Sequence, residues 1–395
     1  GSLPPGLSLD SVGLVIGTPT SSGRFEIEIE VASGTRSAVR SLTFTVMEFD
    51  QTLALGITHT CALDRTGRVY CWGESSGLSA LAPTLQAGSH QFLSIADGAR
   101  NLCGLTVTES VICNATGGQG QAVTLTGTPM RLSSGWTFHC AINTDLQAWC
   151  WGNNDSGELG NGSLRHVQPS SPTEVVGDHQ WRQLAGGNGF GCGIDTGDVA
   201  WCWGNNDFGQ LGDSTVRASL QPVPVAGGHR WERLALGSLH TCGLTTEGQA
   251  YCWGRNVYGQ LGQEGVSRGN TPHSYPLLVD GAHSWSDMSA GGDTNCGMTT
   301  TGTAFCWGFG DRGMLGAGED GVTSTAVPVP VSGGRVWRSI AKGSYHSCGV
   351  SADSASPPLL CWGTGGSGQL GTGQIANEFE PVSVLGDVEW ALTGR

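Results

Sequence analysis

Charged residues are scarce in this sequence, and positively charged ones are the scarcest. Only 13% of the 395 residues are charged, and 19 Lys and Arg stand against 33 Asp and Glu, for a net charge of −14. Nucleic-acid binders concentrate Lys and Arg along one face. The sequence also lacks the run of roughly 18 apolar residues that a membrane-spanning helix needs. It therefore predicts neither a nucleic-acid partner nor membrane insertion.

Motifs of several enzyme classes are missing too. The sequence contains no Cys-x-x-Cys of thiol–disulfide catalysts, no His-Glu-x-x-His zinc motif and no phosphate-binding loop. The Asn- and Asp-containing loops at 152–157 and 204–209 carry one carboxylate each, whereas a calcium loop needs several. We therefore expect no metal and no cofactor.

Glycine, by contrast, is abundant, with 65 residues. A chain of helices would use far more Lys, Glu and Ala, because these residues have high helix propensity. Many tight turns between short strands need glycine instead, because glycine adopts the left-handed backbone conformation without strain. The composition predicts an all-β fold.

Fourteen cysteines form seven couples, six of them ten residues apart and the last thirteen apart. The couples are Cys61 and Cys71, Cys103 and Cys113, Cys140 and Cys150, Cys192 and Cys202, Cys242 and Cys252, Cys296 and Cys306, and Cys348 and Cys361. Within each couple an apolar run, a turn signal and a second apolar run follow one another, which is typical of a β-hairpin.

The register of this hairpin predicts a disulfide. If residues 65–67 form a three-residue loop with Gly67 left-handed, Asp64 pairs with Arg68 and Cys61 stands opposite Cys71. That is a non-hydrogen-bonded pair, with Cα atoms about 4.5–5.5 Å apart, within the range of a disulfide. Zinc sites use much shorter spacers and four converging ligands. We predict seven intra-hairpin disulfides, an oxidising compartment and a secreted or cell-surface location.

A longer pattern with a period near 50 residues surrounds each couple. In its fullest copy Trp231 comes first, Gly237-Ser-Leu-His-Thr-Cys242 follows, and Cys252-Trp-Gly-Arg-Asn-Val-Tyr-Gly-Gln-Leu-Gly262 closes the unit. These strings resemble the regulator of chromosome condensation repeats, in the cysteine-bearing form of bacterial secreted proteins, over about residues 50–390. The resemblance implies a β-propeller with one blade per unit.

Seven units predict a seven-bladed β-propeller over residues 50–395, closed by its N- and C-terminal strands, because an open array would leave unpaired edges. We expect the segment 381–390 to complete the blade that begins at 53–56. Unit two has Asn114 after its second cysteine and no Gly-Gln-Leu-Gly, so its blade should be short or irregular. Residues 1–49 resemble part of the immunoglobulin-like domains of bacterial surface proteins, with alternating strands at 25–31 and 42–46.

Candidate binding residues occupy two variable positions between a repeated glycine and the slot of His59, His240 and His346. Equivalent positions of successive blades lie on one circle at one face, and exposed aromatics and Arg dominate interface energetics. The candidates are Ile57, Arg100, Trp136, Leu239, Asp293 and Tyr345. The alternative, that these are unconstrained turn tips, stays open. We interpret the histidines as hydrogen-bonding braces within each blade, and the Cys-Trp-Gly tryptophans as packing between blades.

These observations favour an extracellular binding module that is monomeric, is not an enzyme, and recognises a protein or a glycan through one propeller face. One alternative is an extracellular hydrolase or lyase with carboxylates in the central funnel, for which Glu319 and Asp320 are the candidates. Another is a structural spacer, which the immunoglobulin-like start favours.

Overall fold

The computed structural model describes residue 3 and residues 7–9, 15–17, 23–33, 36–46, 51–75, 78–88, 90–98, 101–113, 120–167, 171–318, 322–352 and 359–391. The chain divides into two compact units. One comprises Gly1–Asp50 with Arg395, and the other is Gln51–Gly394.

The first unit contains two antiparallel strand pairs. Strand β1 (Leu7–Leu9) pairs with β2 (Val15–Gly17), and β3 (Gly23–Ser33) pairs along its whole length with β4 (Arg36–Val46). Ile27 is buried and Glu28 is exposed, as expected from the apolar–polar alternation of a half-buried strand. The predicted strands at 25–31 and 42–46 are confirmed.

The second unit is a propeller of seven four-stranded antiparallel sheets, which confirms the predicted fold. Blades one to three comprise β5 (Leu53–Leu55), β6 (His59–Leu63), β7 (Val69–Ser75), β8 (Leu78–Leu85), β9 (Phe92–Asp97), β10 (Leu102–Thr106), β11 (Val111–Cys113), β12 (Gln121–Val123), β13 (Pro129–Ser134), β14 (Phe138–Asn143), β15 (Ala148–Gly152) and β16 (Thr173–Glu174).

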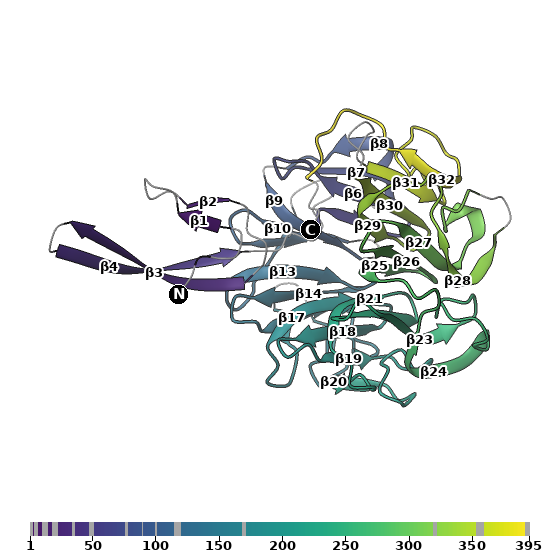
Figure 1. Cartoon of the computed structure of the whole chain (residues 1–395), viewed down its shortest axis with the longest axis horizontal. Coiled ribbons are helices and arrows are strands. Elements are labelled where there is room, and N and C mark those ends of the chain that lie inside the picture. The colour runs from purple at the N-terminus through teal and green to yellow at the C-terminus, as the bar shows by residue number, and fades with distance from the viewer. Residues whose placement is uncertain are drawn as a thin grey trace. The chain divides into compact units, whose positions relative to one another are not determined.

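Blades four to seven comprise β17 (Trp181–Gly186), β18 (Phe190–Asp195), β19 (Ala200–Gly204), β20 (Ser219–Pro224), β21 (Trp231–Leu236), β22 (His240–Thr245), β23 (Ala250–Asn256), β24 (Gly269–Leu278), β25 (Trp285–Gly291), β26 (Thr294–Thr299), β27 (Ala304–Phe309), β28 (Ser324–Pro330), β29 (Trp337–Lys342), β30 (His346–Ser351), β31 (Leu359–Gly363) and β32 (Glu378–Ser383). First strands such as β21, β25 and β29 lie near the middle of the propeller, and fourth strands such as β20, β24 and β28 lie at its edge (Figure 1).

Every cysteine couple forms a disulfide between the second and third strands of its blade. Cys61 and Cys71 are register partners, Asp64 and Arg68 close the loop with a 3.0 Å hydrogen bond, and Gly67 has a φ of 80°. The Cα atoms of the seven bridges are 3.9–4.1 Å apart, closer than expected from strand geometry. Seven formed disulfides indicate an oxidising environment.

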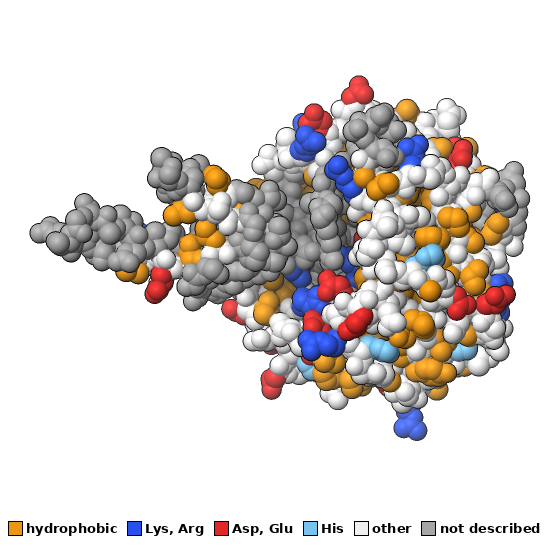
Figure 2. Space-filling model, in the orientation of Figure 1, with side chains coloured by type: hydrophobic (Ala, Val, Ile, Leu, Met, Phe, Trp, Pro, Cys, Tyr) orange, Lys and Arg blue, Asp and Glu red, His pale blue; other side chains and the backbone are white. Residues whose placement is uncertain are grey.

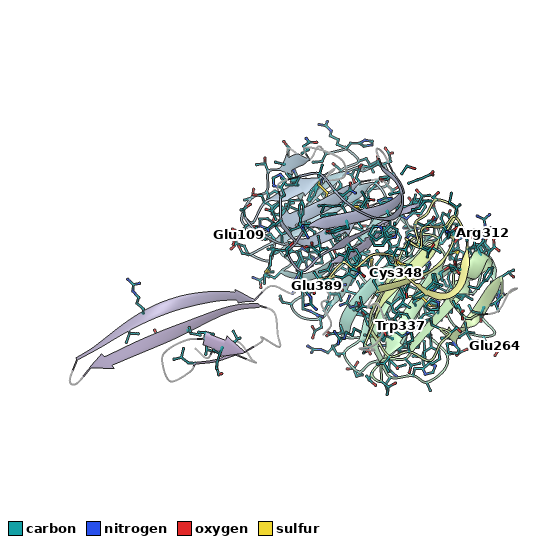
Figure 3. The ribbon with its side chains drawn as sticks, turned by 90° about the horizontal axis from the view of Figure 1, so that it is seen from above. Glu109, Glu264, Arg312, Trp337, Cys348 and Glu389 are labelled. Atoms are coloured by element: carbon teal, nitrogen blue, oxygen red, sulfur yellow. A yellow bond between two sulfur atoms is a disulfide. The ribbon has the colours of Figure 1, made fainter. Side chains whose placement is uncertain are left out.

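The tryptophans pack between neighbouring blades, as predicted. Trp231 and Trp253 of blade five are buried with ring centroids 5.5 Å apart, and they pack against Phe190 and Leu211 of blade four. The Trp253 indole N–H donates to the Gln210 carbonyl of blade four at 2.9 Å. The same bond to the preceding blade is made by Trp72, Trp203 and Trp307. In blade seven, buried Trp337 and Cys348 lie inside the propeller, whereas Glu109 and Glu264 lie at its edge (Figure 3).

The two ends of the propeller chain meet in blade one. Trp390 forms a β-bridge with Asp64, and the Arg65 N–H donates to the Glu389 carbonyl at 2.9 Å. The Trp390 ring centroid lies 5.8 Å from that of Trp72. The C-terminal end of the propeller chain therefore extends the inner edge of blade one, and the strands of that blade come from the beginning of the propeller chain.

Only the end of the segment 381–390 reaches blade one, and this corrects our expectation for its beginning. Val382 and Ser383 belong to β32, where they pair with Cys361 and Leu360 in blade seven. The physical reason is that each repeat supplies the fourth strand of one blade before its tryptophan opens the next.

Blade two is short, as predicted. Its third and fourth strands, β11 and β12, have three residues each, whereas the third strands of the other blades have five to seven.

Within the described ranges, no helix is long and apolar enough to cross a membrane.

Candidate binding surface

Backbone hydrogen bonds join the turns between first and second strands at four of the seven blade junctions. The N–H of the first variable residue donates to the turn of the next blade: Trp136 to Gly187 at 3.1 Å, Asn188 to Ser238 at 3.3 Å, Ser238 to Gly292 at 2.8 Å and Ser344 to Gly56 at 3.3 Å. Because these turns occupy the same place in each blade, and one of the bonds joins blade seven to blade one, the turn residues lie on one circle, which we call the ring.

Five of the six candidate residues lie on this ring. Tyr345 is 44% exposed, and the other four are half-buried: Ile57, Trp136, Leu239 and Asp293. Arg100 lies outside the described residues. The ring therefore presents one exposed aromatic side chain, that of Tyr345, and four partly accessible side chains of different types.

Asp293 is already engaged with the neighbouring blade. Its carboxylate accepts a hydrogen bond from the Gln260 side-chain amide at 2.9 Å and lies 3.7 Å from the Arg255 guanidinium. This side chain positions Arg255 as well as contributing to the surface, a role that spacing along the sequence did not indicate.

A second circle of side chains, missed by the sequence analysis, surrounds the first. The N–H of the residue after each Cys-Trp-Gly donates to the second variable turn residue of the same blade, as in Arg255 to Leu239, Phe309 to Asp293 and Thr364 to Tyr345, all at 2.9 Å. The slot is filled by Glu74, Asn153, Asn205, Arg255, Phe309 and Thr364. The sequence could have indicated this circle, because the residue after Cys-Trp-Gly varies from unit to unit within a repeated pattern, as the turn residues do.

Two members of this second circle, Arg255 and Phe309, each contact an aromatic ring in a loop of the preceding blade. We define the two pairs, Arg255 with Phe208 and Phe309 with Tyr258, as the aromatic–arginine cluster. The Arg255 guanidinium lies 5.6 Å from the Phe208 ring centroid, and the rings of Tyr258 and Phe309 are 4.6 Å apart. All four side chains are half-buried. On the face seen in Figure 2, acidic and basic side chains are interspersed. The cluster combines residue types that are enriched at interface hot spots.

The repeated histidines bond between blades rather than within them, which corrects our interpretation. His59 of blade one lies 2.6 Å from the Asp97 carboxylate of blade two, and His240 of blade five bonds Asn295 of blade six at 2.8 Å. His346 of blade seven bonds the Thr60 hydroxyl of blade one at 2.6 Å. The slot is the first residue of the second strand, directly after the turn that contacts the neighbouring blade.

The environment of these histidines differs from blade to blade. Burial opposes protonation of His59, but the hydrogen bond and charge of Asp97 outweigh it and raise the pKa of His59. Burial, followed by the charges of Lys342 and His59, lowers the pKa of His346. The same slot therefore favours protonation of the histidine in blade one and opposes it in blade seven.

The hydrolase or lyase alternative depends on two candidate carboxylates. Glu319 and Asp320, its candidate carboxylates, lie outside the described residues. Over the described ranges, no three or more His, Cys, Asp and Glu side chains are grouped to hold a metal ion.

Family models match both units. Models of the regulator of chromosome condensation (RCC1) repeat match residues 51–76 and 232–260, and residues 198–244, 247–298 and 301–350. A model described as "Putative Ig domain" matches residues 1–47.

Relatives share the propeller at low identity. The RCC1 domain-containing protein RUG3 of Arabidopsis thaliana is 27% identical over 62% of this chain, which spans about half of that relative, 56% of its length. Yeast RCC1 (Prp20), solved bound to Kap60, has a TM-score of 0.66 at 19% identity and covers 76% of this chain and 80% of its own. The ectodomain of the receptor kinase ACR4 of Arabidopsis thaliana has a TM-score of 0.53 at 20% identity, over 85% of this chain and 98% of its own. The second unit is therefore a seven-bladed propeller in which models of the RCC1 repeat match several segments, and the first unit matches the model of an immunoglobulin-like domain.

Proposed function

We propose that the propeller is an extracellular protein-binding module, and that its partner docks on the face that carries the two circles of turn residues. The observation that carries the proposal is the aromatic–arginine cluster, with Tyr345 exposed on the neighbouring circle. Tyr and Arg side chains supply large contact area and several hydrogen-bond donors. Their substitution by alanine causes some of the largest losses of binding free energy at protein interfaces.

Two further observations support this proposal. Seven disulfides are typical of proteins that work in oxidising compartments outside the cytosol. Among solved structures of the same fold, one is yeast RCC1 with Kap60 bound and another is a receptor kinase ectodomain. These likenesses concern the fold, and a fold by itself does not fix a partner.

The test immobilises the oxidised chain and three variants separately, captures surface proteins on each, and compares the affinities of the captured proteins. The first variant is the double substitution Trp136→Ala and Tyr345→Ala on the turn circle. The second is Arg255→Ala in the aromatic–arginine cluster. The matched control is Tyr275→Ala, because Tyr275 is 54% exposed on β24, the outer strand of blade five.

We expect a captured protein to lose at least ~2 kcal/mol of binding free energy, about thirtyfold in affinity, in the double variant and in Arg255→Ala. Tyr275→Ala should bind as the unsubstituted chain does. Equal affinity for all four proteins would refute the proposed face, and retention of no protein by the unsubstituted chain would refute the protein-binding function.

A further inference from the structure

A polar hollow of about 350 Å³ opens between blades two and three. Asn101 and Gln121 of blade two line one side, and Thr137 and Asn153 of blade three line the other. Trp151 stands among the lining residues and is 1% exposed. The volume lies within the range of about 300–1,000 Å³ found for small-molecule sites.

The hollow lies where a repeated contact is missing. In four other blades the Cys-Trp-Gly indole donates to a backbone carbonyl of the loop preceding it, for example Trp203 to Glu158 at 2.8 Å. Unit two has no Gly-Gln-Leu-Gly string to supply that carbonyl. The Trp151 indole N–H is correspondingly buried and has no hydrogen-bond partner. An unsatisfied buried donor costs free energy that an incoming acceptor can recover.

Trp362 also has a buried indole N–H without a partner. It faces the Gly-Met-Leu-Gly loop of blade six, where Leu315 is buried in the usual place and the Gly316 backbone lies close to the indole. The distinguishing feature of Trp151 is therefore the combination of an unpaired donor with an open polar hollow.

Four polar side chains around the hollow are neutral hydrogen-bonding groups. His166 also lines the hollow, and its Nε2 lies 2.7 Å from the Asp155 carboxylate. Asn101, Gln121 and Asn153 each offer an amide that both donates and accepts, and Thr137 offers a hydroxyl. His139 joins them; its Nδ1 is 2.7 Å from the Ser134 hydroxyl, and burial lowers its pKa to about 4, so it is neutral at physiological pH. Neither carboxylates nor Lys or Arg occur among the described lining residues.

We propose that this hollow binds a neutral saccharide unit, whose hydroxyls exchange hydrogen bonds with the amides of Asn101, Gln121 and Asn153 and supply an acceptor for the Trp151 indole N–H. A hydroxyl both donates and accepts, as amides do, so it satisfies such a lining better than a charged ligand would. Because the indole nitrogen is covered in the free chain, this last bond requires a small shift of side chains at the base of the hollow. The inference rests on the hollow alone and goes beyond the proposed protein-binding function.

The test uses the oxidised chain and the methyl glycosides of glucose, galactose, mannose and N-acetylglucosamine as neutral probes, with glucuronate and sialic acid as charged comparators. Binding is followed by calorimetry and by the tryptophan indole N–H resonances in NMR spectra, with Trp151 assigned from Trp151→Phe. The exposed lining is tested by the double substitution Asn101→Ala and Gln121→Ala. Trp203→Phe is the matched control, because its indole already has a partner.

We expect at least one neutral glycoside to shift the Trp151 indole resonance. Trp151→Phe and the Asn101→Ala, Gln121→Ala double variant should each lose about tenfold in affinity, while Trp203→Phe keeps it. Failure of every neutral glycoside to bind at millimolar concentration, tighter binding of glucuronate or sialic acid, or binding that survives the hollow variants would each overturn the proposal. Arg255→Ala and Tyr345→Ala should leave sugar binding unchanged, so this result stands or fails separately from protein binding.

Discussion

At the scale of single residues, the least expected group is a lysine inside the propeller. Lys342, at the end of β29, is 8% exposed, and its ammonium donates to the His346 carbonyl at 3.2 Å. Burial lowers the pKa of Lys342 from 10.5 to about 7. Because the unfolded chain keeps an ordinary lysine, it binds the proton more tightly than the folded chain between those two values, and folding stability rises with pH across that window.

Lys342→Met should remove this dependence. We expect the unsubstituted chain to gain free energy of unfolding between pH 7 and 9, and the Met variant to show a flatter profile and to be more stable at pH 7 by ~2 kcal/mol. The measurement is denaturant unfolding across this pH range under oxidising conditions. A Met variant that is less stable at pH 7, with the same slope, would show that Lys342 is charged and well solvated.

At the scale of elements, the hairpin loops share one position with a left-handed backbone conformation, but this position is not glycine in every blade. Gly67, Gly248 and Gly302 occupy the left-handed position in blades one, five and six, with φ of 78–80°. Glu109 fills the same position in blade two with φ of 60°. A side chain in this region costs roughly 1–2 kcal/mol, since its Cβ approaches the neighbouring carbonyl.

Glu109→Gly should therefore stabilise the protein by ~0.5 kcal/mol, after the greater flexibility of unfolded glycine offsets part of the relief. Glu109 is exposed at the edge of the propeller (Figure 3), so the effect is local. The converse substitution is Gly248→Ala, which should destabilise by ~1–2 kcal/mol, because its Cβ would also lie 3.2 Å from the Trp285 carbonyl. Thermal unfolding of both variants checks this pair, and a shift of the same sign in both would contradict it.

At the scale of the whole molecule, ring closure depends on a few residues at the end of the chain. Trp390 is 4% exposed and contacts the rings of Trp72 and Tyr70, at 5.8 and 5.7 Å. Trp390→Ala should cost about 3–5 kcal/mol and expose blade one to cleavage, since both the packing and the closure are lost. Calorimetry and limited proteolysis measure the two effects. If Trp390→Ala resembles the surface variant Tyr275→Ala in both, the chain end contributes nothing to closure.

The sequence predicted the repeat unit well because its signals are local. The ten-residue cysteine spacing and Gly67 place Cys61 opposite Cys71 within one hairpin, and hydrogen bonds across so short a loop follow from turn geometry. Seven such units fixed the number of blades. The absence of a Gly-Gln-Leu-Gly string likewise predicted the short blade two, but it did not predict the hollow between blades two and three.

The sequence by itself determined the hairpins and their disulfides, because these follow from contacts within one repeat, and it determined the number of blades, because each repeat supplies one. The tertiary structure decided which residues of different repeats meet. Thr60 and His346 bond although they are 286 residues apart, Arg255 reaches Phe208 and Asp293 across two blade junctions, and Trp390 returns to Asp64. The physical reason is that side-chain direction and blade-to-blade distance are set by packing of the whole ring, which no local pattern encodes.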